Sequence, residues 1–139
     1  MALRLAIITD LHAGHDTGNV KGPLAIDILE EFVATAHNFE PDAVLELGDR
    51  LTDENPQADR ARLLELARVF KRLPYPRHHI NGNHDLLPKA DQEAILEANL
   101  GNHSAEIGGI RRAACGRGDD GNTDCCRQKR DIFFQLPST

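Results

Sequence analysis

The sequence predicts an α/β fold built on a parallel sheet, and three observations lead to this class. Short strand-like runs occupy residues 5–9, 43–47 and 77–80. Helix-length segments with apolar residues at helical spacing separate these runs. Polar residues follow each run almost at once. Strands that alternate with helices favour a parallel sheet with right-handed crossovers, in which ligands bind beyond the carboxyl ends of the strands.

The first half of the chain supplies two strands and one helix. Residues 11–21 contain Gly14 and Gly18 among polar residues and predict a loop. Pro23 suits the first turn of a helix, because its missing N–H has no partner to lose there. One apolar stripe then defines the helix: Ala25, Ile28, Leu29, Phe32, Val33 and Ala36. Pro41 ends this pattern before the second strand.

The second half is less regular. Residues 48–59 predict a long loop, and a helix follows whose apolar face is Leu63, Leu66, Ala67 and Phe70. Pro74 and Pro76 end this helix, and a third helix is expected from about Asp91 to Asn99 or Gly101. Residues 105–110 could form a fourth strand. Residues 111–139 show no apolar periodicity until near their end and predict an irregular or disordered tail.

Composition excludes several classes of protein. The 139 residues carry a net charge of −6, which disfavours binding along a nucleic-acid backbone. No apolar run approaches the length of a membrane span, so no membrane association is expected. The cysteines, Cys115, Cys125 and Cys126, are odd in number and give no disulfide framework. The cytoplasm is therefore the expected compartment, and the oligomeric state is left open.

The polar residues at the strand ends predict a metal site. Asp10 and His12 lie one residue apart after the first strand, Asp49 follows the second, and Asn83 and His84 follow the third. Carboxylate and amide oxygens suit hard divalent ions, while imidazole suits Zn, Fe and Mn. Asp49 has two oxygens and can bridge two ions. His84 is free to donate a proton rather than bind metal. Each motif alone is common in turns, but their occurrence at three consecutive strand ends is specific.

The motifs Asp10-Leu11-His12, Gly48-Asp49 and Gly82-Asn83-His84-Asp85 resemble the first three motifs of the calcineurin-like metallophosphoesterases. The resemblance covers about residues 1–100. It implies two divalent metal ions (Mn, Fe, Zn or Mg), with Asp10 and His12 on the first, Asp49 bridging and Asn83 on the second. It also implies that His84 is catalytic, protonating the leaving alcohol or stabilising the phosphoryl charge, and that a hydroxide bridging the metals is the nucleophile.

The chain departs from the family pattern in two places. Many members carry an aspartate three residues beyond the bridging one, which orients the catalytic histidine; here that position is Thr52, and Asp53 is the candidate substitute. The family's later motifs, a lone histidine and a Gly-His-x-His, have no match, and His103 comes too early. The expected fold is thus the βαβαβ parallel-sheet half of a metallophosphoesterase-like α/β/β/α sandwich with its C-terminal half missing. A truncated domain is expected over residues 1–110, followed by the tail over 111–139.

The predicted function is that of a metal-dependent phosphoesterase, a hydrolase of phosphomonoesters or phosphodiesters. Its acidic charge favours a small phosphate ester as substrate and makes nucleic acid an unlikely one. Two alternatives stay open. The chain could be an inactive remnant that binds metal weakly or needs a partner chain, or an unrelated α/β binding protein. The second alternative is weakened by the lack of a glycine-rich phosphate loop.

Overall fold

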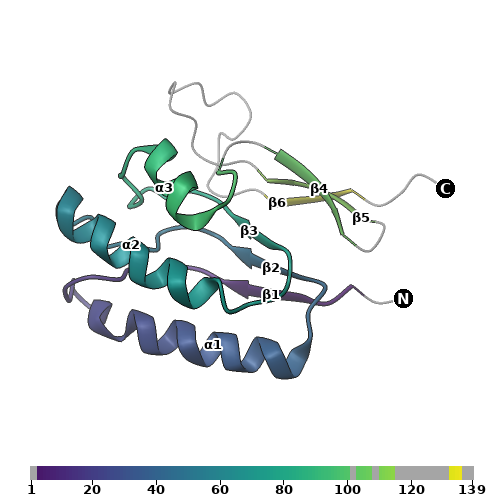
Figure 1. The fold of residues 1–139 in the computed structure, drawn as a ribbon, viewed down its shortest axis with the longest axis horizontal. Helices are drawn as coiled ribbons and strands as arrows, with labels where there is room; N and C mark the ends of the chain where they lie inside the picture. The colour runs from purple at the N-terminus through teal and green to yellow at the C-terminus, as the bar shows by residue number, and fades with distance from the viewer. Residues whose placement is uncertain (1–2, 101–102, 108–109, 115–131, 136–139) are drawn as a thin grey trace.

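A parallel sheet organises the structure, as the sequence predicts (Figure 1). The computed structural model describes residues 3–100, 103–107, 110–114 and 132–135. Within this part of the chain the first sheet has the order β1-β2-β3. Its strands are β1 (Leu5–Ile8), β2 (Ala43–Glu46) and β3 (Arg77–His79). Both neighbouring pairs are parallel, and Glu46 pairs with Ile8 on one side and His79 on the other. The three strands therefore end at the same edge.

Helices follow each of these strands. They are the 3-10 helix η1 (Gly22–Leu24) and the α-helices α1 (Ala25–Phe39), α2 (Pro56–Phe70) and α3 (Lys89–Leu96). Helix α1 packs against α2, and α2 packs against α3 (Figure 1). This strand–helix alternation confirms the predicted α/β class.

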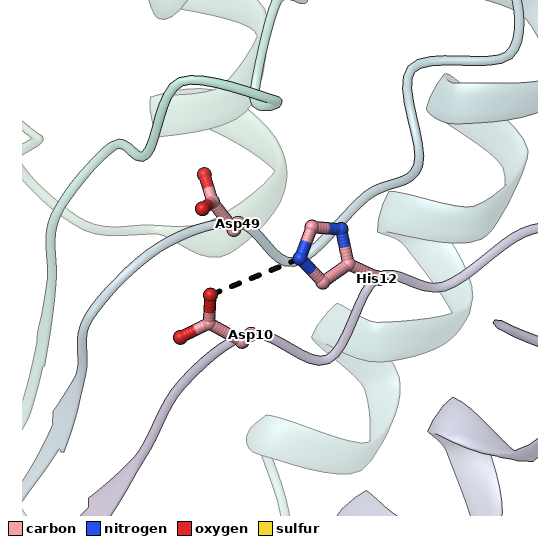
Figure 2. A group of neighbouring side chains, drawn as sticks. All are labelled: Asp10, His12 and Asp49. Atoms are coloured by element: carbon pink, nitrogen blue, oxygen red, sulfur yellow. Dashed lines mark ion pairs between the residues drawn. The ribbon is translucent and has the colours of Figure 1, made fainter. Parts of the chain in front are cut away.

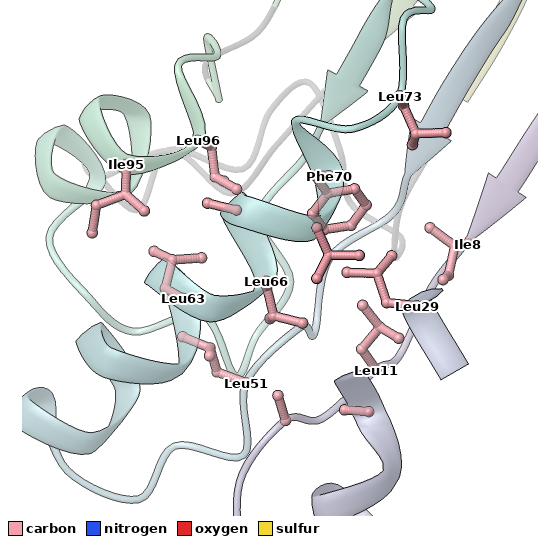
Figure 3. Packing of buried hydrophobic residues seen from close by; sticks show 14 of the residues in the cluster. Ile8, Leu11, Leu29, Leu51, Leu63, Leu66, Phe70, Leu73, Ile95 and Leu96 are labelled. Atoms are coloured by element: carbon pink, nitrogen blue, oxygen red, sulfur yellow. The ribbon is translucent and has the colours of Figure 1, made fainter. Parts of the chain in front are cut away.

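The hydrophobic core lies between the sheet and the helices (Figure 3). Most of the periodic residues of the two long helices point into it, and Leu29, Leu63 and Leu66 are fully buried. Ile28 does not, since it is 52% exposed although it was predicted on the apolar stripe of α1. Full burial of such a side chain stabilises the fold by about 1.5–3 kcal/mol. The opposite side of β1 is less well covered, since Ile7 is 52% exposed. This partial exposure fits the position of β1 at the edge of the sheet.

Helix α2 begins earlier than predicted. The sequence predicts a loop up to residue 59, whereas the helix starts at Pro56. The side chain of Asn55 accepts the backbone N–H of Ala58 at 2.9 Å and so caps the helix. Pro56 occupies the first position, where proline is well tolerated. The Asn-Pro pair thus marks a helix start and not a continuing loop.

Helix α3 is also displaced from its predicted bounds. It starts at Lys89 and ends at Leu96, before the predicted stop at Asn99 or Gly101. Glu97 adopts a left-handed backbone (φ 54°) and its N–H donates to the carbonyl of Glu93, which closes the helix. Glutamate is not a usual residue at such a position, so sequence patterns gave no stop signal there.

A second sheet of the described residues has the order β4-β5-β6 and is antiparallel. Its strands are β4 (His103–Ile107), β5 (Ile110–Ala114) and β6 (Ile132–Gln135). The predicted fourth strand corresponds to β4. The other two strands lie almost entirely in the segment predicted to be irregular. They were not predicted because they lack an alternating apolar pattern, and the structure identifies them by the pairing of their backbones. The division into a domain over 1–110 and a tail over 111–139 stays a prediction, and the three cysteines lie outside the described residues.

None of the helices in the described residues combines the length and the apolar character needed to cross a membrane.

Candidate metal centre

Three of the predicted ligands come together at the carboxyl edge of the sheet. Potential ligand atoms of Asp10, His12 and Asp49 all lie within 4.8 Å of one another. Figure 2 shows the three side chains, with an ion pair of 3.8 Å between Asp10 Oδ1 and His12 Nε2. Asp49 is buried, His12 is half-buried and Asp10 is exposed. Two carboxylates and an imidazole form a donor set that fits a divalent ion, as expected for Mn, Fe or Zn.

Backbone hydrogen bonds hold the two ligand loops side by side beyond the ends of β1 and β2. The N–H of Asp10 donates to the carbonyl of Gly48 at 3.1 Å, and the N–H of His12 donates to that of Asp49 at 3.0 Å. The N–H of Ala13 donates a third such bond to the carbonyl of Arg50 at 2.8 Å. Since these bonds extend the strand pairing, the positions of the ligands follow directly from the register of the sheet.

All three clustered residues have a left-handed backbone. Their φ angles are 56° for Asp10, 45° for His12 and 53° for Asp49. Such angles are uncommon outside glycine and cost of order 1 kcal/mol each, so they persist where the surrounding structure requires them. Asp53 has the same conformation, with φ 59°. The concentration of positive φ angles at this edge is independent support for a functional site.

Gly48 and Gly82 allow the loops after β2 and β3 to touch. A Cβ added at Gly48 would lie 2.3 Å from the nitrogen of Gly82. A Cβ added at Gly82 would lie 1.9 Å from Asp49 Oδ1. No side chain fits between these backbones, so both glycines are required by close approach.

The third loop meets the cluster through Asp49. The backbone N–H of His84 donates to Asp49 Oδ1 at 3.1 Å. The rings of His84 and His12 lie edge to face with centroids 5.1 Å apart. Asn83 is exposed and directly precedes His84 in this loop. The backbone thus brings the predicted second-metal ligand and the predicted catalytic histidine next to Asp49, and their roles remain predictions.

Asp53 is exposed in the loop before α2. Within the described part of the chain, no hydrogen bond or ion pair joins Asp53 to His84. Its predicted role in orienting His84 remains a prediction.

A buried polar cluster that sequence patterns missed lies behind the site. Arg50 is completely buried, and its Nη2 and Nε lie 2.6 and 3.0 Å from Oε2 of Glu46. Its Nη1 donates to Gln92 Oε1 at 2.9 Å and lies 3.5 Å from Asp85 Oδ2. His79 Nδ1 lies 3.1 Å from the same Glu46 oxygen. One signal was available, because a glutamate within the apolar run 43–47 must either break the strand or find a buried partner.

The electrostatics of this cluster favour a charged Glu46 and a neutral His79. Burial by itself raises the pKa of Glu46, but the Arg50 charge and the hydrogen bonds from His79 and Arg50 lower it to about 2. Burial lowers the pKa of His79, against the opposing effect of Glu46. Burial likewise raises the pKa of Asp85, while Arg50 and backbone N–H groups oppose this shift. The carboxylates of Glu46 and Asp85 together hold the pKa of Arg50 above its ordinary value, although burial opposes them.

The fold and the clustered ligands define a class of protein, an α/β domain with a candidate metal centre at the carboxyl edge of its parallel sheet. The family model described as calcineurin-like phosphoesterase matches residues 3–134. The chain belongs to this family. No curated protein matches it.

Two solved structures resemble part of the chain. A dimetal phosphatase from Danio rerio superposes with a TM-score of 0.54 at 18% identity, covering 60% of this chain and 30% of the phosphatase chain. A nuclease from Pseudomonas putida gives a TM-score of 0.47 at 18% identity, covering 76% of this chain and 50% of the nuclease. The chain therefore spans half or less of the length of these two structures. At this identity the phosphatase supports the fold alone.

Proposed function

We propose that this chain carries the metal-binding half-site of a metal-dependent phosphoesterase, which hydrolyses a phosphomonoester or phosphodiester. The observation that carries the proposal is the convergence of Asp10, His12 and Asp49 within 4.8 Å at the ends of two parallel strands. Membership of the phosphoesterase family supports the reaction class.

Each site residue has a distinct task in this proposal. Asp10 and His12 would hold one divalent ion, Asp49 would contribute to both metal sites, and Asn83 would contribute to the second. When bound, such ions supply Lewis-acid stabilisation and water activated near neutral pH. His84, whose ring contacts that of His12, would donate a proton to the leaving oxygen or stabilise phosphoryl charge. Asp53 is the candidate that orients His84.

A small phosphate ester is the proposed substrate. The net charge of −6 disfavours a long polyanion, whereas bound cations reverse the sign locally at the site. The odd cysteine count supports the cytoplasm as the proposed compartment.

The alternative is an inactive remnant that binds metal weakly or needs a partner chain. It is supported by the sequence, which contains no Gly-His-x-His after residue 100. Calorimetric titration with Mn²⁺ separates the two: two tight sites per chain contradict the remnant, and a single weak site supports it.

The direct test is hydrolysis of a chromogenic aryl phosphodiester and of single-stranded DNA with added Mn²⁺. Asp49→Asn should reduce hydrolysis of the aryl ester at least about 100-fold. Even residues that only hydrogen-bond to a metal ligand change metal affinity or activity 10–100-fold when they are substituted, and Asp49 is a proposed ligand itself. The matched control is Asp27→Asn, an exposed position in the first turn of α1. Activity that survives Asp49→Asn would contradict the proposal, and faster cleavage of DNA than of the small ester would overturn the substrate class.

A further inference from the structure

The carboxylate of Asp85 joins the two loops that carry the proposed ligands. Its Oδ2 accepts the backbone N–H of Asp49 at 2.8 Å and that of Gly82 at 2.8 Å. Its Oδ1 accepts the N–H of Arg50 at 3.0 Å. The side chain is buried, so water does not replace these bonds. One side chain thus satisfies three donors from two separate loops.

A second set of contacts fixes Asp85 itself. Nη1 of Arg50 lies 3.5 Å from Oδ2 of Asp85. Nη2 of Arg50 forms an ion pair with Glu46 of β2. Gln92 of α3 accepts from Arg50, and its own amide donates to the carbonyls of Asp85 and Leu87 at 3.0 and 2.7 Å. The loop after β3 is therefore tied both to the central strand and to α3.

We infer that Asp85 is a positioning residue for the metal centre, acting by setting the distance between the Asp49 loop and the loop of Asn83 and His84. This inference rests on the function proposed above. The geometry explains why a carboxylate is needed. Both of its oxygens accept backbone N–H groups, and an amide would turn a donor towards at least one of them.

The close packing of the loops makes the site sensitive to this spacing. Gly82 already lies against Asp49, and the N–H of His84 bonds to Asp49 Oδ1. A loop freed from Asp85 would move the atoms that touch the proposed bridging carboxylate. Removing a group that hydrogen-bonds to a metal ligand typically lowers metal affinity 10–100-fold.

The test compares Asp85→Asn with Leu63→Ala, a fully buried core position on α2. Hydrogen exchange without metal is followed at the amides of Asp49, Arg50 and Gly82, with a helical amide of α1 reporting global unfolding. In Asp85→Asn these three amides should exchange faster than global unfolding explains, and Mn²⁺ affinity should fall about 10–100-fold. Leu63→Ala should leave Mn²⁺ affinity unchanged despite its loss of stability.

The outcomes separate the inference from the proposed function. Wild-type protein that binds no Mn²⁺ overturns both. Wild-type protein that binds Mn²⁺, with equal affinity in Asp85→Asn, overturns the positioning role alone. If Asp85→Asn does not fold, Gln92→Met gives the same comparison: weaker Mn²⁺ binding than in Leu63→Ala supports the role, and equal binding overturns it.

Discussion

Arg50 and Glu46 form an ion pair that is hidden from solvent, with Nη2 and Oε2 2.6 Å apart. The two side chains are 0% and 1% exposed. Removing two charges from water is costly, and the pair is tolerated because further hydrogen bonds satisfy both groups. Glu46 also accepts the backbone N–H of Gly48 at 2.8 Å. The pair thus connects the central strand to the loop that carries Asp49.

Breaking this pair should destabilise the protein strongly. Arg50→Met leaves Glu46 and Asp85 buried without their cation, and we expect a loss of about 3–5 kcal/mol in the free energy of unfolding. Urea unfolding measures it. The matched control is Arg72→Met, which removes the exposed pair with Glu30 and should cost less than about 1 kcal/mol. Equal losses in the two variants would contradict the importance of burial.

His79 and Glu46 should each lower the stability as the pH falls, whereas Asp85, whose folded pKa is raised, opposes them. The pKa of His79 is below 6.5 in the folded protein. Its contribution to the free energy of unfolding is therefore present above pH 6.5 and declines below it, because this histidine is protonated in the unfolded chain before it is protonated in the folded one. Glu46, with a folded pKa of about 2 against 4.5, adds a second loss below pH 4.5. By pH 3 this second term alone amounts to about 2 kcal/mol.

Urea unfolding at a series of pH values checks this behaviour. Nε2 of His79 is buried without a hydrogen-bond partner among the described residues, so a proton there gains no acceptor. His79→Phe should therefore flatten the dependence between pH 7 and pH 5. A wild-type stability that stays constant or rises on acidification over this range would show that His79 is not held neutral.

Gly82→Ala should damage metal binding through a direct clash. The added Cβ would lie 2.4 Å from the backbone nitrogen of Asp49, and so push the two loops apart. We expect Mn²⁺ affinity to fall at least about tenfold, as for other groups that support a ligand. Gly18→Ala is the control, because its Cβ meets nothing within 4 Å although its φ is +54°. If calorimetry finds the same Mn²⁺ affinity in Gly82→Ala and Gly18→Ala, the clash does not affect metal binding and the prediction is wrong.

Asn55→Ala should shorten or weaken α2. The cap lost is the bond from the N–H of Ala58, and its removal should cost about 1 kcal/mol. Thermal unfolding followed by circular dichroism measures the effect, with Gln57→Ala, an exposed position in the first turn, as the control. An unchanged midpoint in Asn55→Ala would mean that Pro56 alone starts the helix.

Local patterns identified most of the first sheet and the ligands at its edge. Strand and helix periodicity is a property of neighbouring residues, so β1, β2 and α1 are readable from sequence. The predicted cluster of Asp10, His12 and Asp49 follows from parallel strands that end together. Strands β5 and β6 were not predicted, because the sequence around them shows no alternating apolar pattern over the length of a strand.

The sequence by itself determined the α/β class and which residue types stand at the strand ends, since both depend on short-range order. Only the tertiary structure decided what holds those ends together. Asp85 meets the N–H of Asp49 from 36 residues away, and Arg50 meets Gln92 from 42. Contacts at such separations depend on how complete loops fold against each other. They cannot be predicted from patterns of adjacent residues. Because they are buried, where the dielectric constant is low, each of these hydrogen bonds is stronger than it would be in water.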